Sequence, residues 1–532
     1  MREGWRSRDD LRILTSILIG LGGLLIVLAV QVVADRRGLP VAVLFVVTGL
    51  GLAWLPGPTA RLEPEVVLEL IIPPLLYAAA LNASLLQIRS QMRPIASMSV
   101  GLVLVTAAVV GVTLNAVDDH LHFAAALALG AAVAPPDPVA ALAIGRRARL
   151  PTRLMTLIEG EGLLNDATAL TLYAIAVTAA TSGGHFSPGH GIVRFVASVA
   201  GGVGCGLLVA WVVRFARRHL NEPLLENALS LATPFGAYAL AEEIHTSGVL
   251  AVVIAGLWLG HQSPLIESGA ARLQTRAVWR LVEFVLEGYV FLLIGQQAPE
   301  IMSDLDLYPV GTVLAAAAVT VGSVLLVRPL WLLWLRRVTN VPGGTPLSHR
   351  DVFALSWAGT RGVITLATAF ALPVAFPDRH LLLFCAYLVV LVTLVGQGLT
   401  FAPLLRALRL RADDSDERRM RAEARLAAVD AALRRLDEVV ADEEVSDEIV
   451  RRLRAVYAGR RERAQQRLAT LDDDEAMDAY AGETETLGMV RRNMIDAERE
   501  ELVRWRDGGR LPEASLRMLQ RELDHQEGLL PR

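Results

Sequence analysis

Charged residues are scarce along most of this chain. They make up 20% of its 532 residues, and they are much sparser up to about Arg406 than after it, while 53% of all residues are hydrophobic. A soluble protein of this length divides into several domains and carries more charge throughout. The scarcity therefore excludes an ordinary soluble protein and predicts a transmembrane domain over residues 1–410. A charged domain follows over residues 411–532.

Cysteines and the motifs of catalysis are also scarce. The two cysteines, Cys205 and Cys385, lie in apolar runs without metal-ligand spacing, so we expect small core side chains and no disulfide framework. The sequence has no nucleotide-binding glycine loop, metal cluster or catalytic triad. We therefore predict a protein that is not an enzyme, has no cofactor and binds no nucleic acid.

Apolar segments long enough to cross a bilayer fill residues 1–410. A spanning helix needs about 20 apolar residues. The first segment is too long for a signal peptide, so we predict a span there. A turn at Glu243–Thr246 could join two segments into one, which leaves the count at twelve or thirteen. The thirteen candidates are 11–34, 39–56, 64–86, 94–117, 121–145, 155–181, 191–215, 223–242, 247–261, 277–297, 308–335, 351–376 and 380–405.

Arginines alternate between the connecting loops. They follow every second segment, for example Arg146 and Arg147 after the fifth, which favours thirteen spans with a cytoplasmic C-terminus. An odd count suits two inverted six-helix repeats, whose binding sites lie at interrupted helices. Two matching segments are interrupted. Pro135-Pro136-Asp137-Pro138 breaks the fifth, and Gly359-Thr360-Arg361-Gly362 breaks the twelfth.

Buried charges mark the expected transport site, because charge at membrane depth is costly. The sixth segment contains Glu159, Glu161, Asn165, Asp166 and Thr168. A buried carboxylate can hold either a proton or a desolvated cation, which suffices for antiport; a purely structural role is the alternative for Asp166. The prolines around Asp137 remove backbone donors, so Asp137 is either a cation ligand or the cap of a kinked helix.

Other charged residues have less specific positions. Arg361 needs a buried anion, and Glu161 is the predicted partner, unless Arg361 extends to the membrane surface. Glu287 is either a site carboxylate or a structural hydrogen-bond partner. His245 lies in a loop, where pH sensing is a minor alternative. We expect the following residues near segment ends to be interfacial: Arg194, Glu242, Glu283 and Arg328.

Several motifs recur in a fixed order between residues 73 and 362. Taken together they resemble the monovalent cation:proton antiporter-1 family of sodium/proton exchangers. The motifs are Pro73-Pro74-Leu75-Leu76, Asp137-Pro138-Val139-Ala140, Glu159-Gly160-Glu161 with Leu164-Asn165-Asp166, Ala241-Glu242 with Ser247-Gly248-Val249-Leu250-Ala251, Phe291-Leu292-Leu293-Ile294-Gly295 and Trp357-Ala358-Gly359-Thr360-Arg361-Gly362.

The resemblance implies a homodimer in the cell membrane, in which a core subdomain with two broken, crossing helices moves against a dimerisation subdomain. It implies that Asp166 binds Na⁺ or H⁺ with help from Asn165, Asp137 and the Pro136 carbonyl. It also implies that Glu161 and Arg361 form the core ion pair. Further candidates are Glu159, Glu287 and Thr168. An Asn-Asp pair is similar to that of electroneutral exchangers, which implies one-for-one exchange of Na⁺, with K⁺ or Li⁺ as alternatives.

The chain departs from the family pattern at three positions. Pro136 stands where Thr is frequent, Gly162 where Ser is frequent, and Tyr77-Ala78 where many members have an acidic residue. The coordination shell therefore has fewer side-chain oxygens than usual, which leaves the preference for Na⁺ over K⁺ open.

Residues 411–532 have apolar positions at helical spacing, such as Leu426, Val429 and Leu433, and later Leu516, Leu519 and Leu523. We expect amphipathic cytoplasmic helices that either bind a regulator or only solubilise the protein. The whole pattern predicts an all-α membrane antiporter that serves pH and sodium homeostasis. The alternatives are a cation channel and a K⁺-selective proton-coupled exchanger that the tail regulates.

Overall fold

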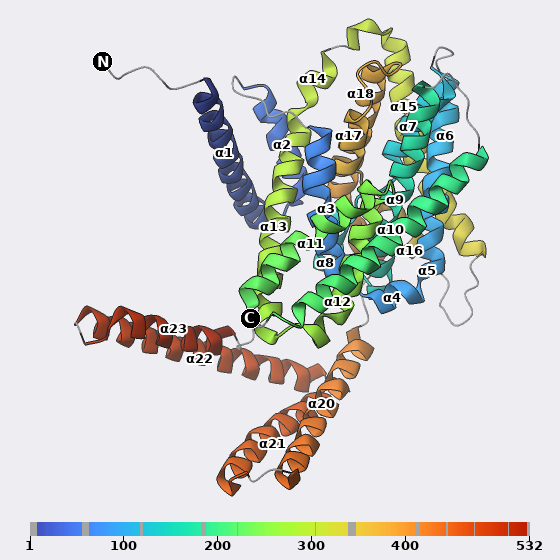
Figure 1. Ribbon diagram of the computed structural model, residues 1–532. Coiled ribbons are helices and arrows are strands. Elements are labelled where there is room, and N and C mark those ends of the chain that lie inside the picture. Colours follow the sequence, from blue (N-terminus) through green and yellow to red (C-terminus); the bar gives the residue numbers. More distant parts are fainter. Residues whose placement is uncertain are drawn as a thin grey trace, which may run out of the picture. The chain divides into compact units, whose positions relative to one another are not determined.

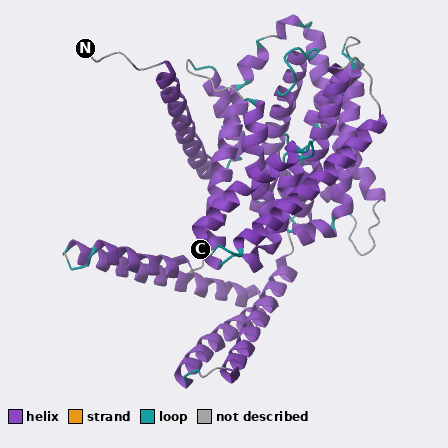
Figure 2. Cartoon of the chain, in the orientation of Figure 1, coloured by secondary structure: helices purple, strands orange, loops and turns teal. Residues whose placement is uncertain are grey.

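The protein is helical throughout the part that is described. The computed structural model has no strand among those residues (Figure 2). It divides into two compact units, residues 1–412 and 413–532. The described residues are 8–55, 63–117, 121–181, 188–220, 222–303, 305–338, 347–410, 414–442, 445–472, 474–508 and 510–528.

The helices of the first unit cover each of the predicted segments. Within the described ranges, seven helical stretches are long and apolar enough to cross a membrane, and the number of spans stays a prediction. In chain order the elements are α1 (Arg8–Arg37), α2 (Val41–Ala53), η1 (Val66–Ile71), α3 (Ile72–Asn82), α4 (Leu85–Ser90), α5 (Met92–Ala96), η2 (Ser97–Leu102), α6 (Val103–Asn115), α7 (Phe123–Val133), α8 (Pro138–Arg147), α9 (Thr152–Thr181), α10 (Pro188–Arg217), α11 (Pro223–Glu243), α12 (Gly248–Ile266), α13 (Gly269–Gln296), α14 (Ala298–Met302), η3 (Leu305–Leu307), α15 (Val310–Val338), α16 (His349–Trp357), α17 (Val363–Phe370), α18 (Arg379–Leu391), η4 (Val392–Gln397) and α19 (Gly398–Leu408).

Two of the predicted segments are broken in their middle. Helix α7 ends at Val133 and α8 begins at Pro138, because the prolines between them cannot donate backbone hydrogen bonds. Helix α16 ends at Trp357 and α17 begins at Val363. The two interruptions are residues 134–137 and 358–362, which lie outside the helices, and hydrogen bonds join them across the fold.

The helices of the first unit pack as two sets (Figure 1). In one set α13 lies against α2, and α12 lies against α3, α10 and α11. In the other set α6 lies against α7 and α15, while α7 and α18 lie against α17. We call the first set the scaffold helices (α1–α3 and α10–α13) and the second the core helices (α5–α9 and α15–α19).

The second unit is formed by two helical hairpins. The helices are α20 (Asp414–Asp442), α21 (Asp447–Ala469), η5 (Thr470–Asp472), α22 (Asp474–Asp507) and α23 (Glu513–Gly528). Arg461 donates to Asp430 at 2.6 Å between α21 and α20, and Arg499 donates to Asp524 at 2.6 Å between α22 and α23. Val429, Leu516 and Leu523 of the predicted apolar positions are buried.

Candidate ion-binding site

The two broken helices are held together at their interruptions by one backbone hydrogen bond and one from a side chain to the backbone. The Asp137 amide donates to the Thr360 carbonyl at 2.7 Å, and the Thr360 hydroxyl donates to the Asp137 carbonyl at 2.8 Å. The Asp137 amide and the Thr360 carbonyl have no partner within a helix, because both helices are interrupted at this point. The crossing therefore satisfies backbone groups that would otherwise be left unpaired inside a membrane protein.

Arg361 supplies donors for the carbonyls at the end of α7. Its Nε donates to the Val133 carbonyl at 2.9 Å and its Nη2 to the Ala134 carbonyl at 3.1 Å. Pro138 has no backbone N–H to donate to the Ala134 carbonyl, and the guanidinium provides the donor instead. Its Nη1 also donates to the Gly359 carbonyl. A buried cation at these carbonyls is also favoured by the negative end of the α7 dipole.

The buried ion pair of the core involves a different arginine from the one predicted. Glu161 pairs with Arg328 of α15 through two hydrogen bonds, Nη1 to Oε1 and Nη2 to Oε2, the latter 2.8 Å long. The predicted Glu161–Arg361 pair is wrong, because the Arg361 guanidinium is directed at backbone carbonyls. The interfacial position predicted for Arg328 is also wrong, since Arg328 is only 3% exposed.

Asp137 caps α8 and lies beside the α16–α17 interruption. Its Oδ1 accepts a hydrogen bond from the Val139 amide at 2.9 Å, as an N-cap residue does. Its Oδ2 lies so close to Gly362 that a Cβ atom at that position would overlap it. The capping role and a ligand role are compatible, because the cap occupies one carboxylate oxygen.

Asn165 and Asp166 lie next to this crossing on α9. Asn165 is fully buried and donates from Nδ2 to the Pro136 carbonyl at 3.0 Å, while its Oδ1 has no hydrogen-bond partner among the described residues. Asp166 is 4% exposed, and within the described part of the chain its carboxylate accepts no hydrogen bond. The charges of Asp166 and Asp137 interact. These side chains offer oxygen atoms of the kind that hard cations prefer.

A cavity of about 810 Å³ connects this site with charged residues at the surface. Asp137, Asp166, Glu159, Glu283 and Glu287 all contribute to its lining, together with Pro136. Glu287 and Glu159, two of the further candidates, are thereby brought to the site, but Thr168 is buried elsewhere on α9. The cavity ends at three exposed arginines: Arg146, Arg276 and Arg280.

Glu283 is a cavity carboxylate whose position the sequence did not reveal. It was expected to be interfacial, but it lies one helical turn before Glu287 on α13 and lines the same cavity. The spacing of four residues between Glu283 and Glu287 places both side chains on one helix face, and this spacing could have predicted the position of Glu283. Of the other residues expected at segment ends, Arg194 is exposed, and Glu242 accepts a hydrogen bond from the Gly248 amide at 3.3 Å.

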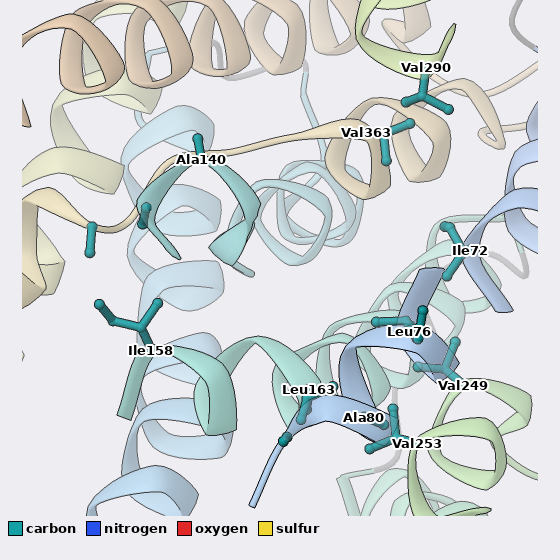
Figure 3. Close-up of a cluster of buried hydrophobic side chains, with 14 of the residues drawn as sticks. Ile72, Leu76, Ala80, Ala140, Ile158, Leu163, Val249, Val253, Val290 and Val363 are labelled. Atoms are coloured by element: carbon teal, nitrogen blue, oxygen red, sulfur yellow. The ribbon is translucent and has the colours of Figure 1, made fainter. Parts of the chain in front are cut away.

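The rest of the cavity wall is mostly apolar, with Asn82 and Thr365 as its polar members. Ile72 and Leu76 of α3, Leu163 of α9 and Val363 of α17 line it. Figure 3 shows Leu76 beside Val249 of α12, within the same buried cluster. An ion in the cavity therefore meets polar groups mainly along the acidic residues and at the crossing.

Close packing explains one departure from the family pattern. A Cβ atom at Gly162 would overlap the ring of Pro138, the first residue of α8. Glycine at 162 therefore allows α9 to approach the start of α8, which brings Asn165 within hydrogen-bond distance of Pro136.

A Gly362→Ala variant tests how closely the crossing is packed. The added methyl group must displace the Asp137 carboxylate or separate the two interruptions. Displacements of about 1 Å at enzyme sites cost up to about a hundredfold in rate, so we expect ion exchange in liposomes to fall about tenfold or more. Gly322→Ala in α15 is the matched control, because its Cβ meets no atom within 4 Å. Equal exchange by both variants would contradict a tight crossing.

Two crossed, broken helices with a buried carboxylate at the end of a cavity define an ion-coupled membrane transporter. Comparisons with known proteins agree. Residues 23–407 match the family model described as sodium/hydrogen exchanger, transmembrane. An uncharacterized Na⁺/H⁺ exchanger of Mycobacterium tuberculosis is 34% identical over 88% of this chain and 87% of its own length. The Na⁺/H⁺ antiporter ApNhaP of Aphanothece halophytica is 30% identical over 73% of each chain.

The fold has a solved counterpart. The sodium proton antiporter MjNhaP1 from Methanocaldococcus jannaschii superposes with a TM-score of 0.58 at 19% identity, covering 74% of this chain and 99% of that one. The chain belongs to the transmembrane sodium/hydrogen exchanger family. It is an integral membrane antiporter, and the family resemblance inferred from the motifs is confirmed.

Proposed function

We propose that the chain exchanges Na⁺ for H⁺, one for one, at Asp166. The observation that carries this proposal is that the Asp166 carboxylate is buried, has no hydrogen-bond partner in the described part of the chain and lines a cavity that leads to the surface. A buried charge without a partner is costly. Either a proton or a cation removes that cost, and the two exclude one another.

The neighbouring oxygens form the rest of the cation shell. Asp137 Oδ2 and Asn165 Oδ1 accept no hydrogen bond from the residues that the structure describes, whereas the Pro136 carbonyl already accepts one from Asn165. A bound cation would therefore contact two carboxylates, one amide oxygen and water in the cavity. Na⁺ is the proposed ion, as the name of ApNhaP supports, and K⁺ and Li⁺ are the ions against which it is tested.

The proposal that exchange is electroneutral rests on the number of carboxylates that alternate between a cation and a proton. Asn165 is neutral and Asp137 keeps its cap in either state, so a single carboxylate, Asp166, alternates between one cation and one proton. The core helices would carry it by moving against the scaffold helices, in a homodimer in the cell membrane. This exchange would serve pH and sodium homeostasis.

The charge pattern supports one orientation. Arg146, Arg276 and Arg280 lie at the cavity's surface end, and basic loops face the cytoplasm. The cavity would then open to the cytoplasm, and residues 411–532 would form a cytoplasmic module that binds a regulator. A preference for K⁺ would mean that the same mechanism moves another ion. A cation channel, by contrast, would need no carboxylate that alternates between a cation and a proton.

A liposome assay tests this function. Purified protein is reconstituted with an internal pH dye and an imposed pH gradient, and Na⁺, Li⁺, K⁺ or choline is added outside. We expect Na⁺ to change the internal pH at a rate that is unaffected when the membrane potential is clamped at zero. A rate that the clamp alters would contradict one-for-one exchange, and an ionic current without proton movement would indicate a channel.

A further inference from the structure

The cavity has two walls that belong to different sets of helices. The core wall comes from α8, α9 and α17, which the crossing and the Asn165–Pro136 hydrogen bond join into one body. The opposite wall comes from α3 and α13 of the scaffold. Alternating access, as proposed above, requires the surface end of this cavity to close when the two walls approach one another.

Arg146 lies on the core wall at that end. It is in the last turn of α8, its side chain is 64% exposed, and its Nη2 lies 3.3 Å from Oε1 of Glu159 on α9. This is the single hydrogen bond of its guanidinium within the described part of the chain, although a guanidinium has five N–H groups. Arg146 therefore has donors left for a second partner.

The scaffold wall offers that partner. Glu283 and Glu287 of α13 line the cavity, and the charge of Arg146 interacts with both. Neither carboxylate accepts a hydrogen bond from another described residue in this open arrangement. Glu283 lies nearer than Glu287 to Arg276 and Arg280 along α13, that is, nearer to the surface end of the cavity.

We infer that Arg146 closes the cavity by exchanging its partner Glu159 on the core wall for Glu283 on the scaffold wall. An exposed ion pair contributes about 0–1 kcal/mol, so the Glu159 pair is easily given up. When the walls approach and water leaves, the attraction between opposite charges grows because the local dielectric constant falls. The Arg146–Glu283 pair would thus form only in the closed state and would keep the cation from returning.

Cross-linking tests this exchange of partners. Both native cysteines are buried, and replacing them by alanine gives a background for the pair Arg146→Cys and Glu283→Cys. A disulfide needs Cα atoms within about 7 Å, so oxidation should trap the closed state in vesicles. We expect maleimide labelling of both cysteines to disappear, exchange to stop, and a reductant to restore both. The control pair is Arg147→Cys with Glu283→Cys, because Arg147 pairs with Asp35 of α1 and does not line the cavity.

Swapping the charges of residues 146 and 283 provides a second test, because recovery of the exchange rate in the double variant is not expected if the two residues have only structural roles. Arg146→Glu and Glu283→Arg should each lower the maximal exchange rate several-fold, and the double variant should recover it. The inference would be overturned by a 146/283 pair that stays uncross-linked in vesicles that exchange ions, or by a double variant no better than the single ones. Cross-linking without any exchange by the cysteine-free parent would instead refute the proposed antiport and leave the closure intact.

Discussion

Asp166→Asn is expected to abolish cation–proton exchange and leave the protein folded. Asparagine has nearly the shape of aspartate, but it neither holds a proton nor neutralises a cation. Because the Asp166 carboxylate makes no hydrogen bond with another described residue, the substitution breaks none. It also removes the cost of burying a charge, so the melting temperature should stay equal or rise.

The measurement combines the liposome assay with a thermal melt of the same preparation. Asp35→Asn is the matched control: the chemical change is identical, but Asp35 is exposed on α1, where it pairs with Arg147 outside the cavity. We expect this control to keep both its exchange and its melting temperature. If Asp166→Asn exchanged ions as well as Asp35→Asn does, the ion site would lie elsewhere.

Local chemistry made much of the site predictable. The breaks at 134–137 and 358–362 follow from proline and glycine at those positions, since both act on the backbone of their own helix. Asp137 and Asp166 could be selected as candidates because a carboxylate in a membrane-spanning segment is costly and is therefore usually functional. The sequence also predicted that the carbonyls around the prolines would need new donors. It did not show that Arg361 supplies them.

The partner of Glu161 could not be found from the sequence, because it depends on how distant helices pack. Arg328 lies 167 residues from Glu161. It was expected to be interfacial because it lies toward the end of an apolar segment, but α15 packs against the core along that part and buries it. Arg361 and Arg328 are both buried arginines near Glu161, and only the geometry separates them. The packing role of Gly162 could not be predicted from the sequence either, since its contact with Pro138 is also made between helices.

Arg328→Met is expected to give the largest loss of stability of any single replacement considered. It leaves Glu161 as a buried charge without its partner, and breaking such a pair costs about 3–5 kcal/mol. It also removes the Nε donor that holds the Leu355 carbonyl near the end of α16 at 2.8 Å. We expect a low yield of folded protein and a clearly lower melting temperature in detergent, measured by fluorescence-detected size exclusion after heating.

Replacing Glu161 as well separates the ion pair from the hydrogen bond to Leu355. Apolar residues of similar volume can replace both members of a buried pair at little cost, so Glu161→Met should recover most, but not all, of the stability that Arg328→Met loses. The same second change should not rescue Arg361→Met, because that variant leaves the carbonyls of Val133, Ala134 and Gly359 without donors whether or not Glu161 is charged. Rescue of Arg361→Met instead of Arg328→Met would mean that Glu161 pairs with Arg361 in the membrane, as the sequence alone suggested.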